Sequence, residues 1–162
     1  MHTRKMSGAA IGAAMLLMTA CAHTGDMTPM PGAIPPPDVA GIVATANQGE
    51  IEQGQAASSK ATSSDVRSFA QMMVTDHTAA LTTARETFAR AGVTPADNDT
   101  TRQLQATSAR TVTNLSTYSG TAFDRTYMQS QVDLHQWLLT SLDTALIPSS
   151  TGEMRTLLET QR

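Results

Sequence analysis

The sequence predicts an all-α protein whose folded part is an up-and-down four-helix bundle. Three observations support this. Apolar residues recur at steps of three and four, Pro and Gly separate the periodic stretches, and no stretch alternates as a strand would. Aromatic residues make up only 4% of the chain, and this scarcity favours helices that pack closely through small side chains. Residues 38–162 form the predicted bundle domain, which is long enough for one hydrophobic core.

Residues 1–20 predict a signal peptide of the lipoprotein type. Arg4 and Lys5 precede a short apolar run that is too brief to cross a bilayer as a mature helix. The run ends in Met-Thr-Ala-Cys, which resembles the lipobox of bacterial lipoproteins, and Cys21 is the only cysteine. We therefore expect a lipid on Cys21 that attaches the protein to a membrane. The alternative is ordinary cleavage nearby, with Cys21 incidental.

Ala22, rather than aspartate, follows the cysteine. By resemblance to lipoprotein sorting in bacteria with two membranes, this predicts a periplasmic domain anchored to the outer membrane. Residues 21–37 hold five of the seven prolines without periodicity, which predicts a flexible tether. Without residues 1–20 the chain keeps 9 Lys and Arg against 14 Asp and Glu, so its net charge is −5. No basic residues cluster, and no nucleic-acid partner is expected.

Capping signals divide the domain into helices. Ser63-Ser64-Asp65 predicts an N-terminus, Gly92 a C-terminus, and two capping boxes, Thr121–Asp124 and Ser150–Glu153, predict two further starts. The last helix reaches Arg162 after only about three turns. The predicted helices are residues 38–62, 63–91, 100–118, 121–147 and 150–162.

Two histidines fall on or beside the apolar stripes of long helices. His77 lies in line with Met73 and Ala84, and His135 lies in line with Met128 and Leu142. Each is near the middle of its helix, so the two side chains could meet inside a bundle. A metal site is one interpretation. The alternative is that each is a core residue hydrogen-bonded to a single partner.

Two acidic residues are additional candidate ligands. Glu50 is in register with Gly54, Ala57 and Ala61, small residues that let a neighbouring helix approach closely. A buried carboxylate is costly without a cation or donor, so an inward Glu50 needs a metal or a histidine; otherwise it lies on a solvated face. Asp76 lies about 100° around the helix from its histidine neighbour and is a further candidate, which would either contact a neighbouring side chain or cap outer polar groups.

Three segments together carry a resemblance to a known family. They are ANQGEIEQG at residues 46–54, VRSFAQMMVTDH at residues 66–77, and FDRTYMQSQVDLH at residues 123–135. They resemble a bacterial exported family, domain of unknown function 4142, and the likeness covers about residues 40–162. The resemblance implies a ferritin-like bundle in an exported or outer-membrane protein, and it implies no defined activity.

The chain departs from ferritin-like proteins in two ways. Two-iron sites of that class use Glu-x-x-His motifs, but Val74 and Val132 stand three residues before the histidines, so ferroxidase activity is not expected. The family's final helix commonly carries another histidine, which a last helix ending at Arg162 does not reach. A truncated last helix would leave an apolar face that a protein partner or a second copy could cover.

Three hypotheses remain open on sequence grounds. The first is a lipid-anchored bundle that binds iron, copper or zinc through His77 and His135, with Glu50 and Asp76 as further ligands. The second is a structural or interaction module of the cell envelope without metal, and the third is a small metalloenzyme. No catalytic residue is assigned, because no nucleophile elbow or Gly-rich phosphate loop occurs. Met73 and Met128 are predicted to be packing residues rather than copper ligands.

Overall fold

The computed structural model describes residue 27 and residues 32–162. Within this part the protein is a bundle of helices, which confirms the predicted fold class. The signal peptide, Cys21 and most of the predicted tether lie outside the described residues. No described helix combines the length and apolar character that crossing a membrane requires. The elements are α1 (Pro36–Lys60), α2 (Ser64–Arg90), α3 (Asp99–Ser116), α4 (Gly120–Ser141), a π-helical turn (Leu142–Leu146) and α5 (Gly152–Gln161).

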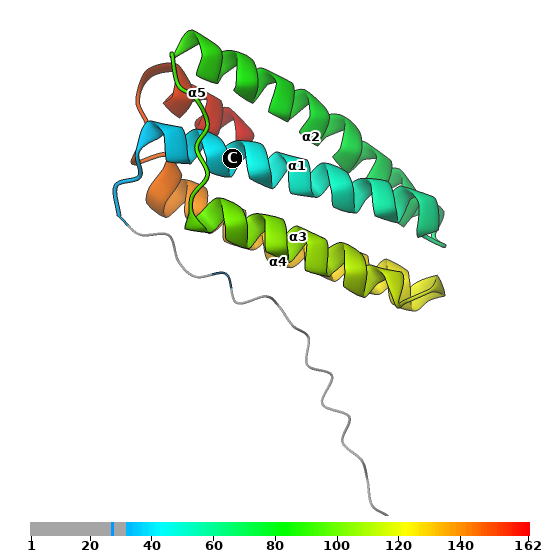
Figure 1. Cartoon of the computed structure of the whole chain (residues 1–162). Coiled ribbons are helices and arrows are strands. Elements are labelled where there is room, and N and C mark those ends of the chain that lie inside the picture. The colour runs from blue at the N-terminus through cyan, green and yellow to red at the C-terminus, as the bar shows by residue number, and fades with distance from the viewer. Residues whose placement is uncertain (1–26, 28–31) are drawn as a thin grey trace, which may run out of the picture.

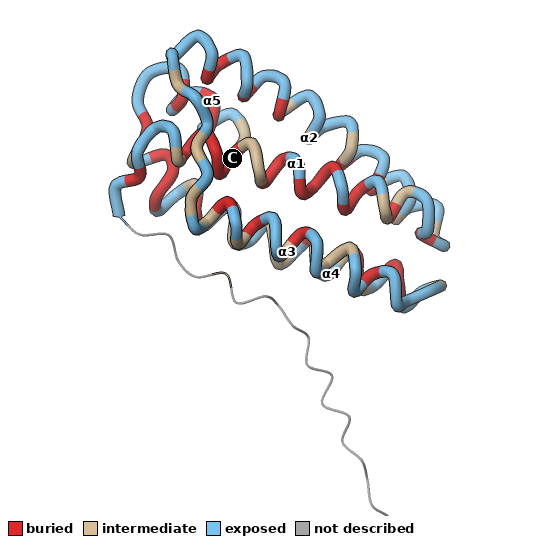
Figure 2. The backbone as a smooth tube through the Cα atoms, viewed as in Figure 1, coloured by how far each residue is buried: buried red, intermediate tan, exposed pale blue. Residues whose placement is uncertain are grey.

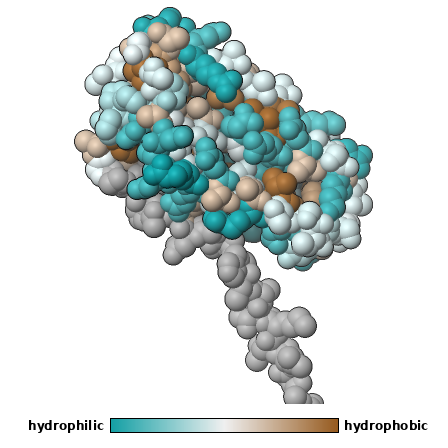
Figure 3. Space-filling view, in the orientation of Figure 1, coloured by the Kyte–Doolittle hydropathy of each residue, from teal (hydrophilic) through white to brown (hydrophobic). Residues whose placement is uncertain are grey.

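Four long helices run alternately up and down, and α1 lies between α2 and α3 (Figure 1). The short α5 turns back at the end where α1 begins and packs against α2. Buried positions cover most of the length of α1 but only one side of α2 (Figure 2). On the face seen in Figure 3, apolar residues form small patches separated by polar ones. The central position of α1 explains why polar residues on this helix become buried.

Close approach of α1 and α2 depends on the small residues predicted to allow it. A Cβ atom placed on Gly54 would lie 2.9 Å from Cγ2 of Val74 and 3.0 Å from the carbonyl oxygen of Ala70. Ala57 and Ala61 of the same stretch are also buried. The predicted role of these residues in helix packing is therefore confirmed.

Helix starts differ from the sequence predictions in one informative respect. The two predicted capping boxes are wrong: α4 and α5 begin after Ser119 and Thr151, and neither residue makes a side-chain capping bond. Asp124 instead accepts hydrogen bonds from the backbone N–H groups of Thr62 (2.9 Å) and Ser63 (2.8 Å). Its carboxylate thus caps the start of α2, a long-range contact that a local motif does not reveal.

Other helix boundaries agree with the sequence predictions in part. Gly92 adopts φ +66° after α2, as expected for a C-terminal glycine. Helix α3 has a capping box that the sequence analysis missed, formed by Asn98 and Thr101. The folded part also begins slightly earlier than residue 38, because Ile34 is buried and α1 starts at Pro36.

The interior has two apolar clusters with polar residues between them. The larger cluster joins the start of α1, the ends of α2 and α4, and α5, around Phe88 and Leu158. The smaller one lies at the other end of the long helices and contains Leu115 and Phe123. Between the two apolar clusters, polar side chains from α1, α2 and α4 form a layer. We define this central polar layer as Asn47, Glu50, Gln53, His77, Tyr127, Gln131 and His135.

Candidate functional site

The central polar layer contains buried groups without hydrogen-bond partners. Glu50 is completely buried, and both of its carboxylate oxygens lack a hydrogen bond. The Tyr127 hydroxyl and Oε1 of Gln131 are also buried without one, whereas Nε2 of Gln131 donates to Oε1 of Gln53 at 3.1 Å. Native interiors satisfy most such atoms, so several unpaired atoms in one place distinguish this layer from ordinary core.

His135 connects this buried group to the surface. Its Nδ1 atom lies 2.8 Å from the backbone carbonyl oxygen of Gln131, one helical turn earlier, and 3.8 Å from Oε1 of Glu50. A carbonyl oxygen can only accept a hydrogen bond, so Nδ1 must carry the proton and donate it. In the neutral ring, Nε2 then holds the free lone pair. The His135 side chain as a whole is 45% exposed.

His77 is held in the same tautomer by a different neighbour. Asn47 is buried, and its Nδ2 donates to the carbonyl oxygen of Val43 at 2.9 Å. This bond fixes the amide so that Oδ1 lies 2.9 Å from Nδ1 of His77 and accepts its proton. The lone pair of His77 is therefore also on Nε2. Metal-binding histidines commonly have this arrangement, with the second ring nitrogen bonded to an oxygen acceptor.

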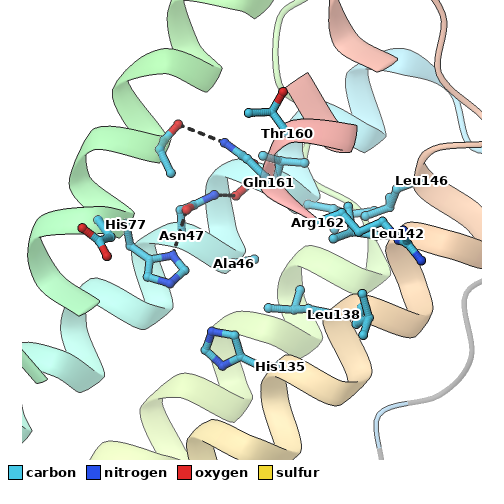
Figure 4. A pocket seen from close by; sticks show the side chains of 15 residues that line it. Ala46, Asn47, His77, His135, Leu138, Leu142, Leu146, Thr160, Gln161 and Arg162 are labelled. Carbon is cyan, nitrogen blue, oxygen red and sulfur yellow. Dashed lines mark hydrogen bonds between the residues drawn. The ribbon is translucent and has the colours of Figure 1, made fainter. Parts of the chain in front are cut away.

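The two imidazoles are neighbours at one end of a cavity (Figure 4). Their ring centroids are 6.0 Å apart and their planes are inclined by 70°. The cavity has a volume of about 380 Å³ and extends from the histidines toward the last residues of α5. Apolar side chains line most of it: Ile42, Val43, Ala46, Leu138, Leu142 and Leu146. The site thus combines two nitrogen donors with an apolar space.

Burial shifts the proton equilibria of the layer. Desolvation and, to a smaller extent, His135 lower the pKa of His77 to about 4 against the opposing influence of Asp76, so His77 is neutral at pH 7. Burial raises the pKa of Glu50 to about 7, against the opposing influence of His135 and Gln131. Burial and the Glu50 charge both raise the pKa of Tyr127 above its usual value. A neutral imidazole with a free lone pair is the form that binds a metal.

The candidate ligands from the sequence take three different positions. His77 and His135 face the cavity together. Glu50 lies beside the Nδ1 atom of His135. Asp76 is an exposed residue that lines the cavity. Across residue 27 and residues 32–162, no three His, Cys, Asp or Glu side chains gather closely enough to hold one ion. The described residues therefore offer a metal two imidazole donors. Glu50 lies near Nδ1 of His135, the ring nitrogen that is not free to bind a metal.

Met73 and Met128 are packing residues, as predicted. Met73 is buried, and Met128 packs against the smaller apolar cluster. Neither lines the cavity. Their thioether groups therefore contribute packing, and the cavity offers nitrogen rather than sulfur donors.

The chain matches one known protein family. Residues 24–162 match the family described as domain of unknown function 4142. The chain belongs to that family. The match includes both histidines and the whole bundle, and it begins within the predicted tether. No curated protein and no solved structure matches the chain of this DUF4142 member.

Sequence patterns did not predict the residues that hold the histidines of this DUF4142 protein in place. Asn47 and Gln131 both contact a histidine ring, and Tyr127 lies in the same buried layer. One signal was present, because Gln131 and Tyr127 precede His135 by four and eight residues and therefore share its helix face. The contact of Asn47 with His77 joins two helices, and no local spacing indicates it.

Proposed function

We propose that this protein is an exported helical bundle that carries a transition-metal centre on the imidazoles of His77 and His135. One observation carries the proposal: both Nδ1 atoms are engaged by oxygen acceptors, which leaves a free Nε2 lone pair on each of two imidazoles that line the same cavity. Purely structural histidines need only one good partner each. They have no need for matching tautomers at a shared cavity.

The charge of the surroundings also supports a cation. Glu50 is buried without a hydrogen bond, 3.8 Å from the ring of His135. Positive charge on a metal bound to that ring would stabilise the carboxylate, and the carboxylate would make the imidazole a better ligand. Imidazole nitrogens suit iron, copper, nickel and zinc. Val74 and Val132 stand where a ferritin-like two-iron site has carboxylates, so a mononuclear centre is proposed.

Thermal unfolding of the full chain with and without metal ions tests this proposal. An ion at 100 times its dissociation constant should stabilise the folded protein by about 2.7 kcal/mol and raise its melting temperature. Changing both His77 and His135 to Ala should abolish that rise. Gln136→Ala, an exposed neighbour on α4, is the matched control and should keep it. A rise that survives the double substitution would place the metal elsewhere.

We also propose a localisation for the protein, which is tested separately. A lipid on Cys21 would anchor the bundle to a membrane facing the periplasm, in agreement with the lipobox-like sequence. We expect Cys21→Ser to move the protein from the membrane fraction to the soluble fraction. Unchanged fractionation would exclude lipidation at this residue.

A second candidate is an interaction module of the envelope. The observation that favours it is the group of exposed apolar side chains on α2 and α4: Met72 and Val132 are each 47% exposed, and Leu139 is 44% exposed. A second copy of the chain could cover them. Sedimentation of the full chain distinguishes this candidate, because Val132→Gln should then dissociate a dimer while the response to metal stays absent.

A further inference from the structure

The cavity beside the two histidines has more room than a metal ion needs. Its volume of about 380 Å³ is near the lower end of the range for pockets that hold small organic molecules, and most of its walls are apolar. Leu139 and Asp76 line it and are exposed, so a ligand can enter from solvent. Covering apolar walls with an apolar group removes them from water and is favourable. The cavity therefore suits the hydrocarbon body of a small organic molecule.

The polar groups at the α5 end of the cavity have partners within the protein (Figure 4). Gln161 donates from Nε2 to the backbone carbonyl oxygen of Ala80 at 3.3 Å. The guanidinium group of Arg162 forms an ion pair with Asp143 and donates to both of its carboxylate oxygens. The positive charge of Arg162 is therefore compensated, and this end of the cavity does not require a charged ligand.

The histidine end of the cavity carries an uncompensated negative charge. Among residue 27 and residues 32–162, the Asp76 carboxylate has neither a hydrogen bond nor an ion-pair partner. It nevertheless acts on this end of the cavity, because its charge opposes the lowering of the pKa of His77. Burial lowers that pKa to about 4, so the His77 ring is neutral at pH 7 and does not repel a cation. A cleft with one sign of charge favours a ligand group of the opposite sign.

We propose that the cavity binds a small amphipathic amine, with its ammonium group beside Asp76 and its hydrocarbon body against the leucine side chains toward α5. The ammonium group would pair with the carboxylate and remain partly hydrated, because Asp76 is exposed. A carboxylate in the same place would meet a like charge. The site adjoins the proposed metal centre, but the inference goes beyond that centre and does not rest on a bound metal.

Three ligands with the same phenylethyl body and different charges test the proposal. Phenethylamine is a cation at pH 7, phenethyl alcohol is neutral, and hydrocinnamate is an anion. Binding to the full chain in detergent and chelator is measured by NMR titration. We expect the amine to bind more tightly than the alcohol by a factor of roughly two to five, as for one exposed ion pair, and hydrocinnamate to bind most weakly.

Two pairs of variants locate the binding. Asp76→Asn should remove the advantage of the amine over the alcohol, whereas Glu86→Gln, which removes an exposed charge of α2 away from the cavity, should keep it. Ala80→Phe fills the cavity and should abolish binding of all three ligands. Ala79→Phe adds the same bulk to the exposed face of α2 and should bind them as the wild type does. Circular dichroism checks that each variant is folded.

The outcomes separate this inference from the metal proposal. If the alcohol or hydrocinnamate binds the wild type as tightly as the amine, the assigned charge preference is wrong. Binding that survives Ala80→Phe would place the ligand outside the cavity, and no saturable binding of any of the three would overturn the proposal. Because chelator is present throughout, a failure of metal ions to raise the melting temperature would not change these results.

Discussion

The start and the middle of α1 illustrate two uses of a buried position. Near its start, Val39 and Ile42 join the larger apolar cluster with Phe88 and Leu158. Two turns beyond Ile42, Glu50 is equally inaccessible but has no hydrogen-bond partner and faces a histidine. Apolar burial stabilises the fold, whereas burial of an unpaired carboxylate costs free energy. The comparison indicates that the apolar cluster maintains the bundle and that the central polar layer has another purpose.

The largest effect should come from the apolar cluster. Phe88 is 2% exposed within it, so Phe88→Ala should lower the free energy of unfolding by about 3–5 kcal/mol. Leu139→Ala is the control, because this side chain lines the cavity and is already 44% exposed. Urea denaturation measures both, and the Leu139 variant should lose well under half as much. Equal losses would mean that the cavity wall is as important to the fold as the apolar cluster.

The same contrast explains how much the sequence could predict. Helical periodicity placed His77 and His135 on or beside the apolar stripes, and the small residues near Glu50 indicated close packing, because both signals are local. The expectation that both histidines are buried was wrong: His77 is half-buried and His135 is exposed. The partner of each histidine depends on how the helices come together. Asn47 meets His77 across 30 positions, and Asp124 caps a helix that begins 60 positions earlier. Such contacts leave no spacing pattern in the sequence.

The second-largest effect on the free energy of unfolding should come from the central polar layer, and it depends on pH. Between pH 4.5 and about 7 the unfolded chain has lost the Glu50 proton while the folded protein keeps it, so this group makes stability fall as pH rises. His77 acts in the opposite sense. Between about pH 4 and 6.5 the unfolded chain binds a proton that the folded protein does not, so stability rises with pH. The two contributions oppose each other where the ranges overlap.

Glu50→Gln should remove the Glu50 contribution to the pH dependence of stability and leave that of His77. We expect the metal-free variant to gain stability steadily from about pH 4 to 6.5, and above pH 7 to exceed the wild type by on the order of 3 kcal/mol. The wild-type curve should be nearly flat over the shared range and should fall toward pH 7. Urea denaturation at a series of pH values in chelator provides the comparison. Parallel curves for the two proteins would show that Glu50 does not hold its proton in the folded state.

The smallest change in stability should have the clearest meaning for the site. Asn47→Leu removes the acceptor for Nδ1 of His77, and the loss of one such hydrogen bond should cost about 1 kcal/mol. If His77 is a metal ligand, removing this orienting partner should also weaken binding about 10–100-fold. Nitrogen NMR of the metal-free protein should show the ring losing its single tautomer, independently of any metal. A tautomer change without a change in metal affinity would make Asn47 a partner of a structural histidine, and the central polar layer would then resemble the apolar cluster in purpose as well as in burial.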